Sequence, residues 1–259
     1  MMSATVTPAD TELRREPETL SGSDMIVRVL AEQGVDVIFG YSGGAILPTY
    51  DAVFRYNEAH SDSMPLIVPA NEQGAGFMAA GYARASGKVG VAMVTSGPGA
   101  TNCVTPVRDC MADSIPIVVI CGQVPTAAIG TDGFQEAPVT NIMGNCAKHV
   151  FLVTEPERLE ATVRTAFAIA STGRPGPVVV DIPKDVQLSL GEYVGPKNIE
   201  HRTYKPKLKG DLDAIREAVD LMANARKPIF YTGGGVINSG PEASQLLREL
   251  VHTTGFPIT

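Results

Sequence analysis

The sequence predicts an α/β fold: a parallel sheet with helices on both faces, followed by the start of a second α/β domain. Three observations support this prediction. From Ser21 onward, short segments rich in Val and Ile alternate with longer segments of helical periodicity. The short segments are apolar throughout, which is typical of strands buried on both faces. Most of them end in glycine-rich or polar turns, where open α/β sheets bind ligands.

The elements of the first domain follow from spacing and from start and stop signals. The first helix is expected to be capped by Ser21 or Ser23 and to run to Gln33, because its apolar residues recur at helical spacing. The next elements are expected in this order: a strand over 35–40, a helix over 45–57, a strand over 66–69, a helix over 72–85, a strand over 89–96, a helix over 100–112 and a strand over 116–122.

The rest of the chain is less regular. Residues 123–147 are rich in Gly, Pro, Thr and Asn, so we expect a functional loop there. A helix over 156–171 and a strand over 177–183 complete the first domain. In the second unit, helices are expected from Asp211 to Ala223 and from Glu242 to His252, with strands at PIFYTGGG and FPIT. The inward residues of its first helix are expected to be Leu212, Ile215, Val219 and Leu221 or Met222.

These elements predict the domain organisation. Residues 1–22 are expected to be a disordered tail, 23–185 the first domain, 186–209 a linker, and 210–259 the truncated start of a central domain. One β-α-β start cannot bury both faces of a sheet, so we expect the chain to be a fragment of a longer protein.

Composition excludes several classes of function. The 259 residues carry a formal net charge of −7, so the basic face that nucleic acid requires is absent and no such partner is expected. No apolar run approaches the ~20 residues that span a bilayer, and the N-terminus lacks the apolar core of a secretion signal. We therefore expect a cytoplasmic protein without a membrane partner. The four cysteines form no CxxC pair and the four histidines are scattered, so no metal site is expected.

Three glycine-rich turns join a strand to a helix: residues 40–45 (GYSGGA), 96–99 (SGPG) and 233–235 (GGG). The second has the arrangement that binds anions at a helix N-terminus, and the third could approach a diphosphate. None of them matches a dinucleotide or Walker fingerprint. A tight turn remains the alternative for each.

Glu72 is the most informative acid. It opens a helix whose neighbouring residues have almost no side-chain bulk, although each interior Gly costs ~1 kcal/mol relative to Ala. A carboxylate in a first turn also complements the helix dipole. Close approach of another backbone, a ligand or a second subunit would explain the small residues. These are Gly74, Ala75, Gly76, Ala79, Ala80 and Gly81.

Four segments in order carry a family resemblance: GYSGGAILPTYDA, NEQGAGFMAAGYARASGKVGVAMVTSGPGATN, GQVPTAAIGTDGFQE and GRPGPVVVDIPKDVQ. From about Ser23 to its end, the chain resembles the pyrimidine-binding domain of thiamine-diphosphate enzymes, and specifically the catalytic large subunits of acetolactate synthases. The resemblance implies thiamine diphosphate and FAD as cofactors, with FAD in a central domain. It places Mg2+ and the diphosphate in a C-terminal domain, whose GDG...N motif is absent here.

The resemblance also implies residue roles. Glu72 matches the glutamate that hydrogen-bonds N1′ of the aminopyrimidine, where a shared proton favours the tautomer that activates thiazolium C2. Gly44 matches the turn that approaches the reacting carbon, Gln135 the acceptor-side loop and Lys184 the substrate entry. The other matched positions are Tyr41, Pro98 and Asn102 in the pyrimidine pocket, Phe134 beside Gln135, Val124 and Pro125 in a hydrophobic channel, and Arg174 at FAD. Apart from the resemblance, Gly233 and Gly234 of the third glycine turn are expected to bind cofactor.

Each of these matches has a simpler alternative. Lys184 could be a solvated lysine, Arg174 could pair with a surface acid, Phe134 could pack ordinarily and Gln135 could satisfy its own loop. The chain also departs from the family pattern at three positions. Ser42 replaces a proline, and Asn71 and Phe77 replace histidines.

The implied reaction is decarboxylation of pyruvate and its joining to pyruvate or 2-oxobutyrate, in valine, leucine and isoleucine synthesis. The resemblance implies a homodimer or tetramer with the active site between subunits, and allows a regulatory small subunit. Sulfoacetaldehyde acetyltransferase and oxalyl-CoA decarboxylase are alternatives that GTDGFQE disfavours, and Glu72 disfavours glyoxylate carboligase. A catalytically silent dimerisation module is the alternative of a different class. The chain alone is expected to show no turnover.

Overall fold

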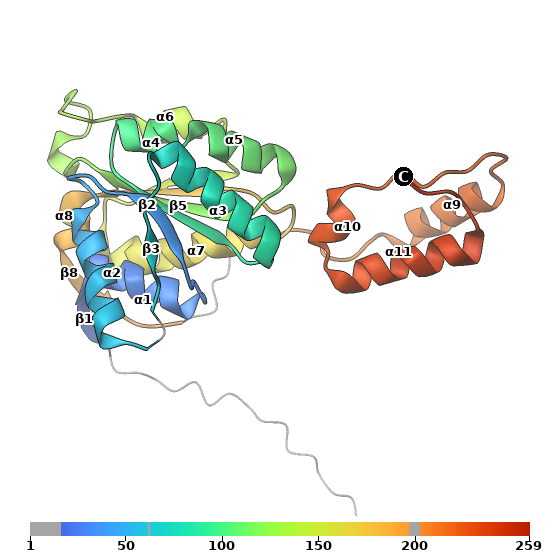
Figure 1. Ribbon diagram of the computed structural model, residues 1–259, viewed down its shortest axis with the longest axis horizontal. Helices are drawn as coiled ribbons and strands as arrows, with labels where there is room; N and C mark the ends of the chain where they lie inside the picture. Colours follow the sequence, from blue (N-terminus) through green and yellow to red (C-terminus); the bar gives the residue numbers. More distant parts are fainter. Residues whose placement is uncertain (1–16, 62, 197–202) are drawn as a thin grey trace, which may run out of the picture.

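A six-stranded parallel sheet forms the centre of the structure (Figure 1). The computed structural model describes residues 17–61, 63–196 and 203–259. The strands lie in the order β3-β2-β4-β5-β7-β6, and every neighbouring pair is parallel, so the predicted fold class is confirmed. The strands are β2 (Ile38–Tyr41), β3 (Leu66–Ile67), β4 (Gly90–Val94), β5 (Ile117–Gln123), β6 (His149–Leu152) and β7 (Val178–Pro183).

Helices cover both faces of this sheet, and each face has its own apolar cluster (Figure 1). Side chains alternate along β5: Val118 and Ile120 join one cluster, whereas Val119 and Cys121 join the other. Burial on both faces explains why the strands read as continuous apolar runs. One face carries α1 (Gly22–Glu32), α2 (Leu47–Ala59), α7 (Leu159–Ser171) and α8 (Lys184–Leu188), and the other carries α3 (Glu72–Ser86), α4 (Pro98–Asn102), α5 (Val104–Asp113) and α6 (Val139–Met143).

The first helix begins and ends as its sequence predicts. The Ser21 hydroxyl accepts a hydrogen bond from the Asp24 amide at 3.1 Å, which makes Ser21 the N-cap of α1. Gly34, at φ +73°, follows its last turn. The four apolar residues expected on its inner face are all buried: Met25, Ile26, Val29 and Leu30.

Some elements within the sheet domain differ from the prediction. The helix expected over 100–112 is divided into α4 and α5 at Cys103. Pro106 has no backbone N–H to donate within a helix. Because a new helix begins at Val104, Pro106 lies in the first turn of α5, where no such hydrogen bond is needed. The short edge strand β6 was not predicted; its four residues, HVFL, are exposed or half-buried, unlike the fully buried runs of β4, β5 and β7.

The predicted tail and linker boundaries are wrong. Within them, β1 (Glu18–Ser21) pairs antiparallel with β8 (Leu190–Tyr193), and α8 extends to Leu188. The partners are far apart in sequence, so no local periodicity indicates the pairing. The rest of the predicted tail, residues 1–16, and part of the predicted linker, residues 197–202, lie outside the described residues.

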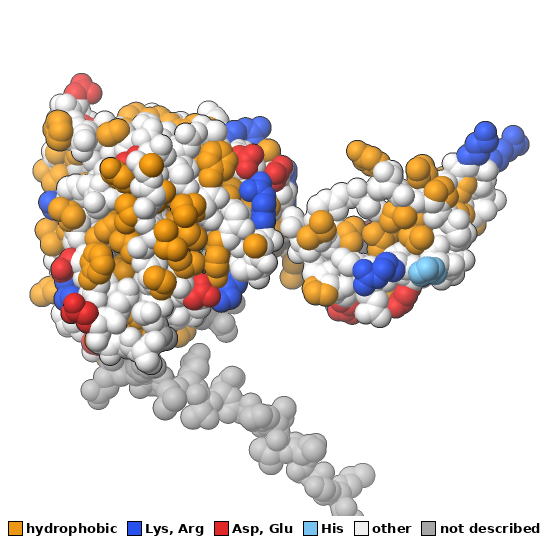
Figure 2. Space-filling view, in the orientation of Figure 1, with side chains coloured by type: hydrophobic (Ala, Val, Ile, Leu, Met, Phe, Trp, Pro, Cys, Tyr) orange, Lys and Arg blue, Asp and Glu red, His pale blue; other side chains and the backbone are white. Residues whose placement is uncertain are grey.

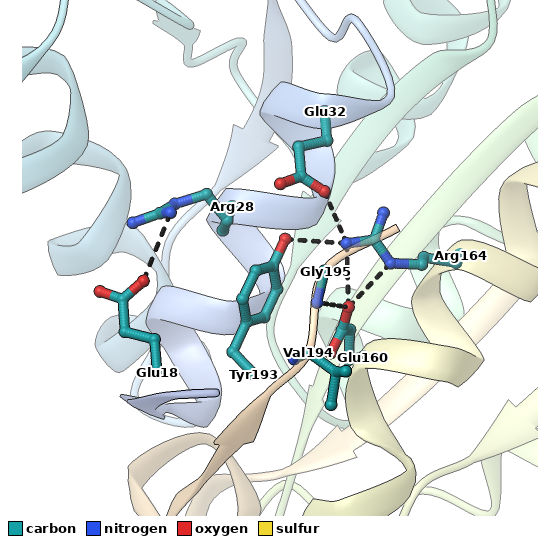
Figure 3. A network of polar contacts seen from close by, with 8 residues as sticks. All are labelled: Glu18, Arg28, Glu32, Glu160, Arg164, Tyr193, Val194 and Gly195. Carbon is teal, nitrogen blue, oxygen red and sulfur yellow. Dashed lines mark hydrogen bonds and ion pairs between the residues drawn. The ribbon is translucent and has the colours of Figure 1, made fainter. Parts of the chain in front are cut away.

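A buried ionic network holds β8 against the helices (Figure 3). Arg164 on α7 donates through Nη2 to Glu32 Oε2 at 2.6 Å and to the Tyr193 hydroxyl at 2.8 Å. Its Nε donates to Glu160 Oε1 at 3.0 Å. The Glu160 carboxylate also accepts the amides of residues 194 and 195 at 2.9 and 3.0 Å. One arginine therefore joins α1, α7 and the segment that leaves the sheet domain.

The C-terminal segment contains α9 (Leu212–Ala223), α10 (Gly234–Asn238) and α11 (Pro241–Thr254), which lie apart from the sheet in Figure 1. The two strands predicted here reduce to one parallel bridge, Phe230 to Ile258. The side chains expected to face inward from α9 are instead largely exposed, since no described element covers them; Leu212 is 68% exposed. No helix in the described part of the chain is long and apolar enough to cross a membrane.

Candidate functional site

The candidate residues gather at one edge of the sheet. Because all six strands are parallel, their carboxyl ends meet at that edge. Tyr41 ends β2, Glu72 follows β3, and α4 with Pro98 and Asn102 follows β4. The loop that carries Gln135 follows β5, and Lys184 begins α8 after β7.

Glu72 is held in a defined orientation at this edge. Asn71 caps α3 by accepting the Gly74 amide through Oδ1 at 2.8 Å, which makes Glu72 the first helical residue. The Glu72 side chain is buried, and its Oε2 accepts a hydrogen bond from Asn102 Nδ2 at 2.8 Å. The other oxygen, Oε1, lies 3.5 Å from where a Cβ on Gly99 would stand and accepts no hydrogen bond from the described residues. Oε1 is therefore the acceptor that a ligand can use.

The groups nearest Glu72 are neutral. Burial, and then the charge of Glu72, raise the pKa of the Cys103 thiol to about 12. The same two causes raise the pKa of the Tyr50 hydroxyl, which donates to the carbonyl of Met93 at 2.9 Å. Neither group supplies a positive charge, so a ligand that donates a proton to Glu72 would meet no competing cation from them.

The small residues of α3 are partly explained by packing within the chain. A Cβ on Gly76 would lie 2.4 Å from Cγ of Pro106 on α5. A Cβ on Gly90 would lie 2.1 Å from the carbonyl oxygen of Ala79, because β4 passes directly beneath the helix. Gly81, in contrast, faces open space and has no such explanation.

The first glycine turn is fixed by the strands beside it. A Cβ on Gly43 would stand 2.4 Å from Cγ2 of Thr95, whose hydroxyl accepts the Ala45 amide at 3.3 Å. The buried Gln187 donates through Nε2 to the carbonyl of Ala45 at 2.8 Å. Gly44 is exposed and has no described atom within 4 Å of its Cβ position. The turn is therefore rigid, with one open position facing solvent.

The second glycine turn contacts the loop predicted to be functional. Gly97 has φ +53°, and its Cβ position lies 2.4 Å from the carbonyl oxygen of Gln135. This contact accounts for the glycine without a phosphate. The backbone amides of this loop are hydrogen-bonded by Glu136 rather than by Gln135. The Glu136 carboxylate accepts hydrogen bonds from the amides of Gly130 and Gly133, and these bonds lower the pKa of Glu136. The Gln135 side chain remains exposed, as does Phe134 at 90%.

Lys184 lies half-buried at the first position of α8 and forms no ion pair with a described acid. The next residue, Asp185, accepts hydrogen bonds from the amide and hydroxyl of Thr126. Burial acts to raise the pKa of Asp185, but these bonds hold it below its ordinary value. Val124 is buried just before Thr126. The loop after β5 is thereby tied to the helix that carries Lys184.

The expected flavin residues lie elsewhere. Arg174 precedes β7, at the opposite, amino end of the sheet. It donates to the Ser114 hydroxyl at 2.8 Å and to the carbonyls of residues 111 and 112 at 3.0 and 3.1 Å, which caps α5. Gly233 is the exposed N-cap of α10, followed by Gly234. The structure does not bring these residues to Glu72. Among the described residues, no group of three His, Cys, Asp or Glu side chains could hold a metal ion.

Three buried polar residues behind the edge were not singled out from the sequence: Gln123, Asp181 and Gln187. The signal was present for two of them, since Asp181 interrupts an apolar strand segment and Gln123 ends one, whereas Gln187 lies in the short helix α8. A polar side chain buried in an apolar strand is costly unless it is hydrogen-bonded, so its presence indicates a hydrogen-bond partner or a function.

Asp181→Asn tests the ionisation of that acid. Burial, opposed by a hydrogen bond from Gln123, raises the pKa of Asp181 from 3.8 to about 7. The folded chain thus binds this proton more tightly than the unfolded chain. The free energy of unfolding therefore falls as the pH rises from 3.8 to about 7, and it stays lower at higher pH. We expect wild type to lose about 2–3 kcal/mol relative to the variant between pH 5 and pH 8. Urea unfolding at both pH values measures this, and a pH-independent difference would contradict it.

The chain is similar in sequence to known proteins. Residues 20–143 match the family described as thiamine pyrophosphate enzyme, N-terminal TPP binding domain. Over 241 residues the chain is 48% identical to the acetolactate synthase large subunit of Mycobacterium tuberculosis, covering 93% of this chain and 38% of that protein. It is 45% identical over 261 residues to the mitochondrial acetolactate synthase catalytic subunit of Saccharomyces cerevisiae, covering 96% and 37%. For the large subunit of Buchnera aphidicola (Schizaphis graminum) the identity is 45%, covering 93% and 42%.

The chain thus spans about two fifths of the length of these relatives. The resemblance predicted from the four segments is confirmed, and the matched region includes Glu72, Asn102 and Gln135. Residues 20–143 are therefore an N-terminal TPP binding domain of the thiamine pyrophosphate enzyme type, and over 93–96% of its length the chain is similar to acetolactate synthase large or catalytic subunits.

Proposed function

We propose that this chain supplies the pyrimidine-binding part of an acetolactate synthase. This transferase would decarboxylate pyruvate and join the two-carbon unit to pyruvate or 2-oxobutyrate, for valine, leucine and isoleucine synthesis. The observation that carries the proposal is the Glu72 carboxylate, which is buried, bonded to Asn102 through one oxygen and unbonded at the other. A fixed carboxylate with a free acceptor oxygen fits the protonated N1′ of an aminopyrimidine.

In this proposal, each residue at the carboxyl edge of the sheet has its own role in the reaction. Bound thiamine diphosphate supplies a carbon nucleophile and an electron sink. Glu72 holds a proton at N1′ through Oε1, and Asn102 fixes the carboxylate so that this oxygen keeps its direction. Tyr41 and Pro98 border the ring, and Gly44 leaves space for the substrate at a rigid turn.

Two further residues serve the substrates in this proposal. The charge of Lys184, which no described acid pairs, attracts the carboxylate of a 2-oxo acid. Gln135 presents its exposed amide to the second 2-oxo acid. Phe134 and Val124 add apolar surface on that side of the edge.

The other cofactors fit the described residues to different extents. No described cluster suits Mg2+, so we place the metal and diphosphate ligands in the part of the relatives that this chain does not span. For FAD, Arg174 offers only Nη1, since Nε and Nη2 are bonded to the end of α5. Gly233 and Gly234 leave open space at the start of α10, where a flavin group could approach the backbone.

A second subunit would complete the site. Figure 2 shows hydrophobic side chains gathered over the face that carries α3. Several large apolar residues are exposed on that helix or just before it in the chain: Phe77, Met78, Ile67 and Val68. Exposed apolar area of this kind marks an association surface. We propose a homodimer or tetramer of cytoplasmic location, with the regulatory small subunit as an optional partner.

A chimera tests the proposed function. This chain replaces the aligned N-terminal part of the Mycobacterium tuberculosis relative, to which it is 48% identical. With pyruvate, thiamine diphosphate, Mg2+ and FAD, the chimera is expected to form acetolactate, and the 259-residue chain alone is expected to form none. A chimera that assembles and binds FAD yet consumes no pyruvate would contradict the proposal and favour a silent dimerisation module.

Neighbouring glycines separate folding from function in this chimera. Gly43→Ala places a methyl group against the Thr95 side chain and is expected to cost about 1–3 kcal/mol of stability. Gly44→Ala meets no atom, so its stability should change by less than about 0.5 kcal/mol while acetolactate formation falls. Urea unfolding and the acetolactate assay measure the two effects. Unchanged turnover in Gly44→Ala would remove Gly44 from the site.

A further inference from the structure

Asp181 is a buried acid that the proposed function does not use. It lies on β7 and is 1% exposed. Its Oδ2 accepts a hydrogen bond from Gln123 Nε2 at 2.9 Å. Its Oδ1 is the only buried side-chain oxygen or nitrogen in the described residues that has no hydrogen-bond partner. Such an atom costs free energy, and a smaller apolar residue would fit the strand pattern better. The acid therefore calls for a role beyond packing.

Gln123 joins this acid to the loop at the sheet edge. The same Nε2 also donates to the carbonyl of Ala137 at 3.0 Å, and Gln123 Oε1 accepts the Val124 amide at 2.9 Å. Ala137 comes directly after Glu136, whose carboxylate holds the amides of Gly130 and Gly133. Hydrogen bonds thus link β7, through Gln123 on β5, to Ala137, which is joined by a peptide bond to the Glu136 that holds residues 130–133.

The surroundings make Gln123 the partner on which Asp181 depends. Asp181 stands opposite Cys121 in the β5–β7 register, and burial raises the pKa of that thiol, which keeps it neutral. The nearby apolar cluster contributes Val139 and Met143 from α6, which carry no charge. No described cation forms an ion pair with Asp181. The carboxyl can therefore act on its surroundings chiefly by fixing the Gln123 amide.

We propose that Asp181, acting through Gln123, is a positioning residue that sets residues 130–137, and with them Gln135, at the carboxyl edge of the sheet. The effect on the reaction rests on the proposed function, in which Gln135 faces the second 2-oxo acid. Asp181 itself touches neither substrate nor cofactor in this arrangement. Gln135 has φ +57°, a backbone conformation that a non-glycine residue keeps only when the surrounding contacts impose it.

Amide hydrogen exchange on the 259-residue chain tests the positioning. Asp181→Val removes one of the two acceptors of Gln123 Nε2 and leaves only the Ala137 carbonyl, whereas Asp181→Asn keeps an acceptor oxygen on a side chain of nearly the same shape. We expect exchange within 130–137 to become at least about tenfold faster in the Val variant, with β4 amides unchanged, and to be restored in the Asn variant. A loop equally protected in a folded Val variant would overturn the proposal. Equal acceleration in the Asn and Val variants would overturn it as well.

The chimera supplies the functional readout. With pyruvate and 2-oxobutyrate competing as second substrates, Asp181→Val is expected to change the ratio of the two products at least about threefold, with Asp181→Asn close to wild type. Equal loss of both products would indicate a purely structural role and overturn the positioning claim. If the parent chimera forms neither product, the proposed function fails, whereas the exchange experiment still decides whether Asp181 sets the loop.

Discussion

The Glu72→Gln chimera is expected to form acetolactate about 100- to 10,000-fold more slowly than the parent chimera, the range that a positioned acid–base group contributes. Glutamine keeps the shape of the side chain, and its oxygen can still accept the hydrogen bond from Asn102. It cannot hold a proton at N1′ at the position of Oε1. Because Glu72 is the buried acid at the carboxyl edge of β2, β3 and β4, no described group replaces it.

Initial rates of acetolactate formation at saturating cofactor measure this effect. Glu58→Gln is the matched control, because Glu58 is an exposed glutamate on α2 and its change should leave the rate within about twofold of the parent. Urea unfolding of the 259-residue chain checks that Glu72→Gln has not simply unfolded the domain. A Glu72→Gln chimera that retains more than a tenth of the parent rate would exclude the acid–base role.

Arg164→Ala is expected to destabilise the chain by about 3–5 kcal/mol, the cost of removing one partner from a buried ion pair. The Arg164 side chain is 5% exposed, and its partners Glu32 and Glu160 are 20% and 12% exposed. Its removal takes the guanidinium group away from both carboxylates (Figure 3). Glu160 also holds the amides of residues 194 and 195, so the loss should loosen β8 and the segment after it.

Urea unfolding followed by circular dichroism measures this loss. Arg158→Ala is the control, because Arg158 lies just before α7 and its side chain is 73% exposed. Its ion pair with Glu155 at 3.8 Å should contribute less than about 1 kcal/mol to stability. If Arg164→Ala does not fold, Arg164→Lys keeps the charge without the fork of donors and should show an intermediate loss. Equal stability of the Arg164 and Arg158 variants would refute the account of the network.

Local patterns were sufficient to predict most of the sheet domain. The caps and periodicity of α1, the apolar run of β5 and the acid at the start of α3 lie within windows of about ten residues, so their signals are local. The antiparallel pair of β1 and β8 joins Glu18 to Tyr193, and no local window contains both strands. For the same reason, the order of strands in the sheet was not predicted.

In the candidate site, too, residues with local signals could be predicted, whereas contacts between residues far apart in the sequence could not. Glu72, Gly44 and Gln135 could be named from motifs, and the structure places them at one edge. Their supporting residues could not be inferred, because the bond from Gln187 to Ala45 spans 142 positions and the bond from Gln123 to Asp181 spans 58. The packing of Gly76 against Pro106 likewise depends on how two helices meet on the sheet.

A crystal structure of the chimera with thiamine diphosphate bound would show whether Glu72 contacts the cofactor as proposed. We expect Glu72 Oε1 to lie within about 2.6–3.2 Å of N1′ of the aminopyrimidine, while Oε2 keeps its bond to Asn102. A pyrimidine ring bound elsewhere, or a Glu72 carboxylate turned away from N1′, would contradict it.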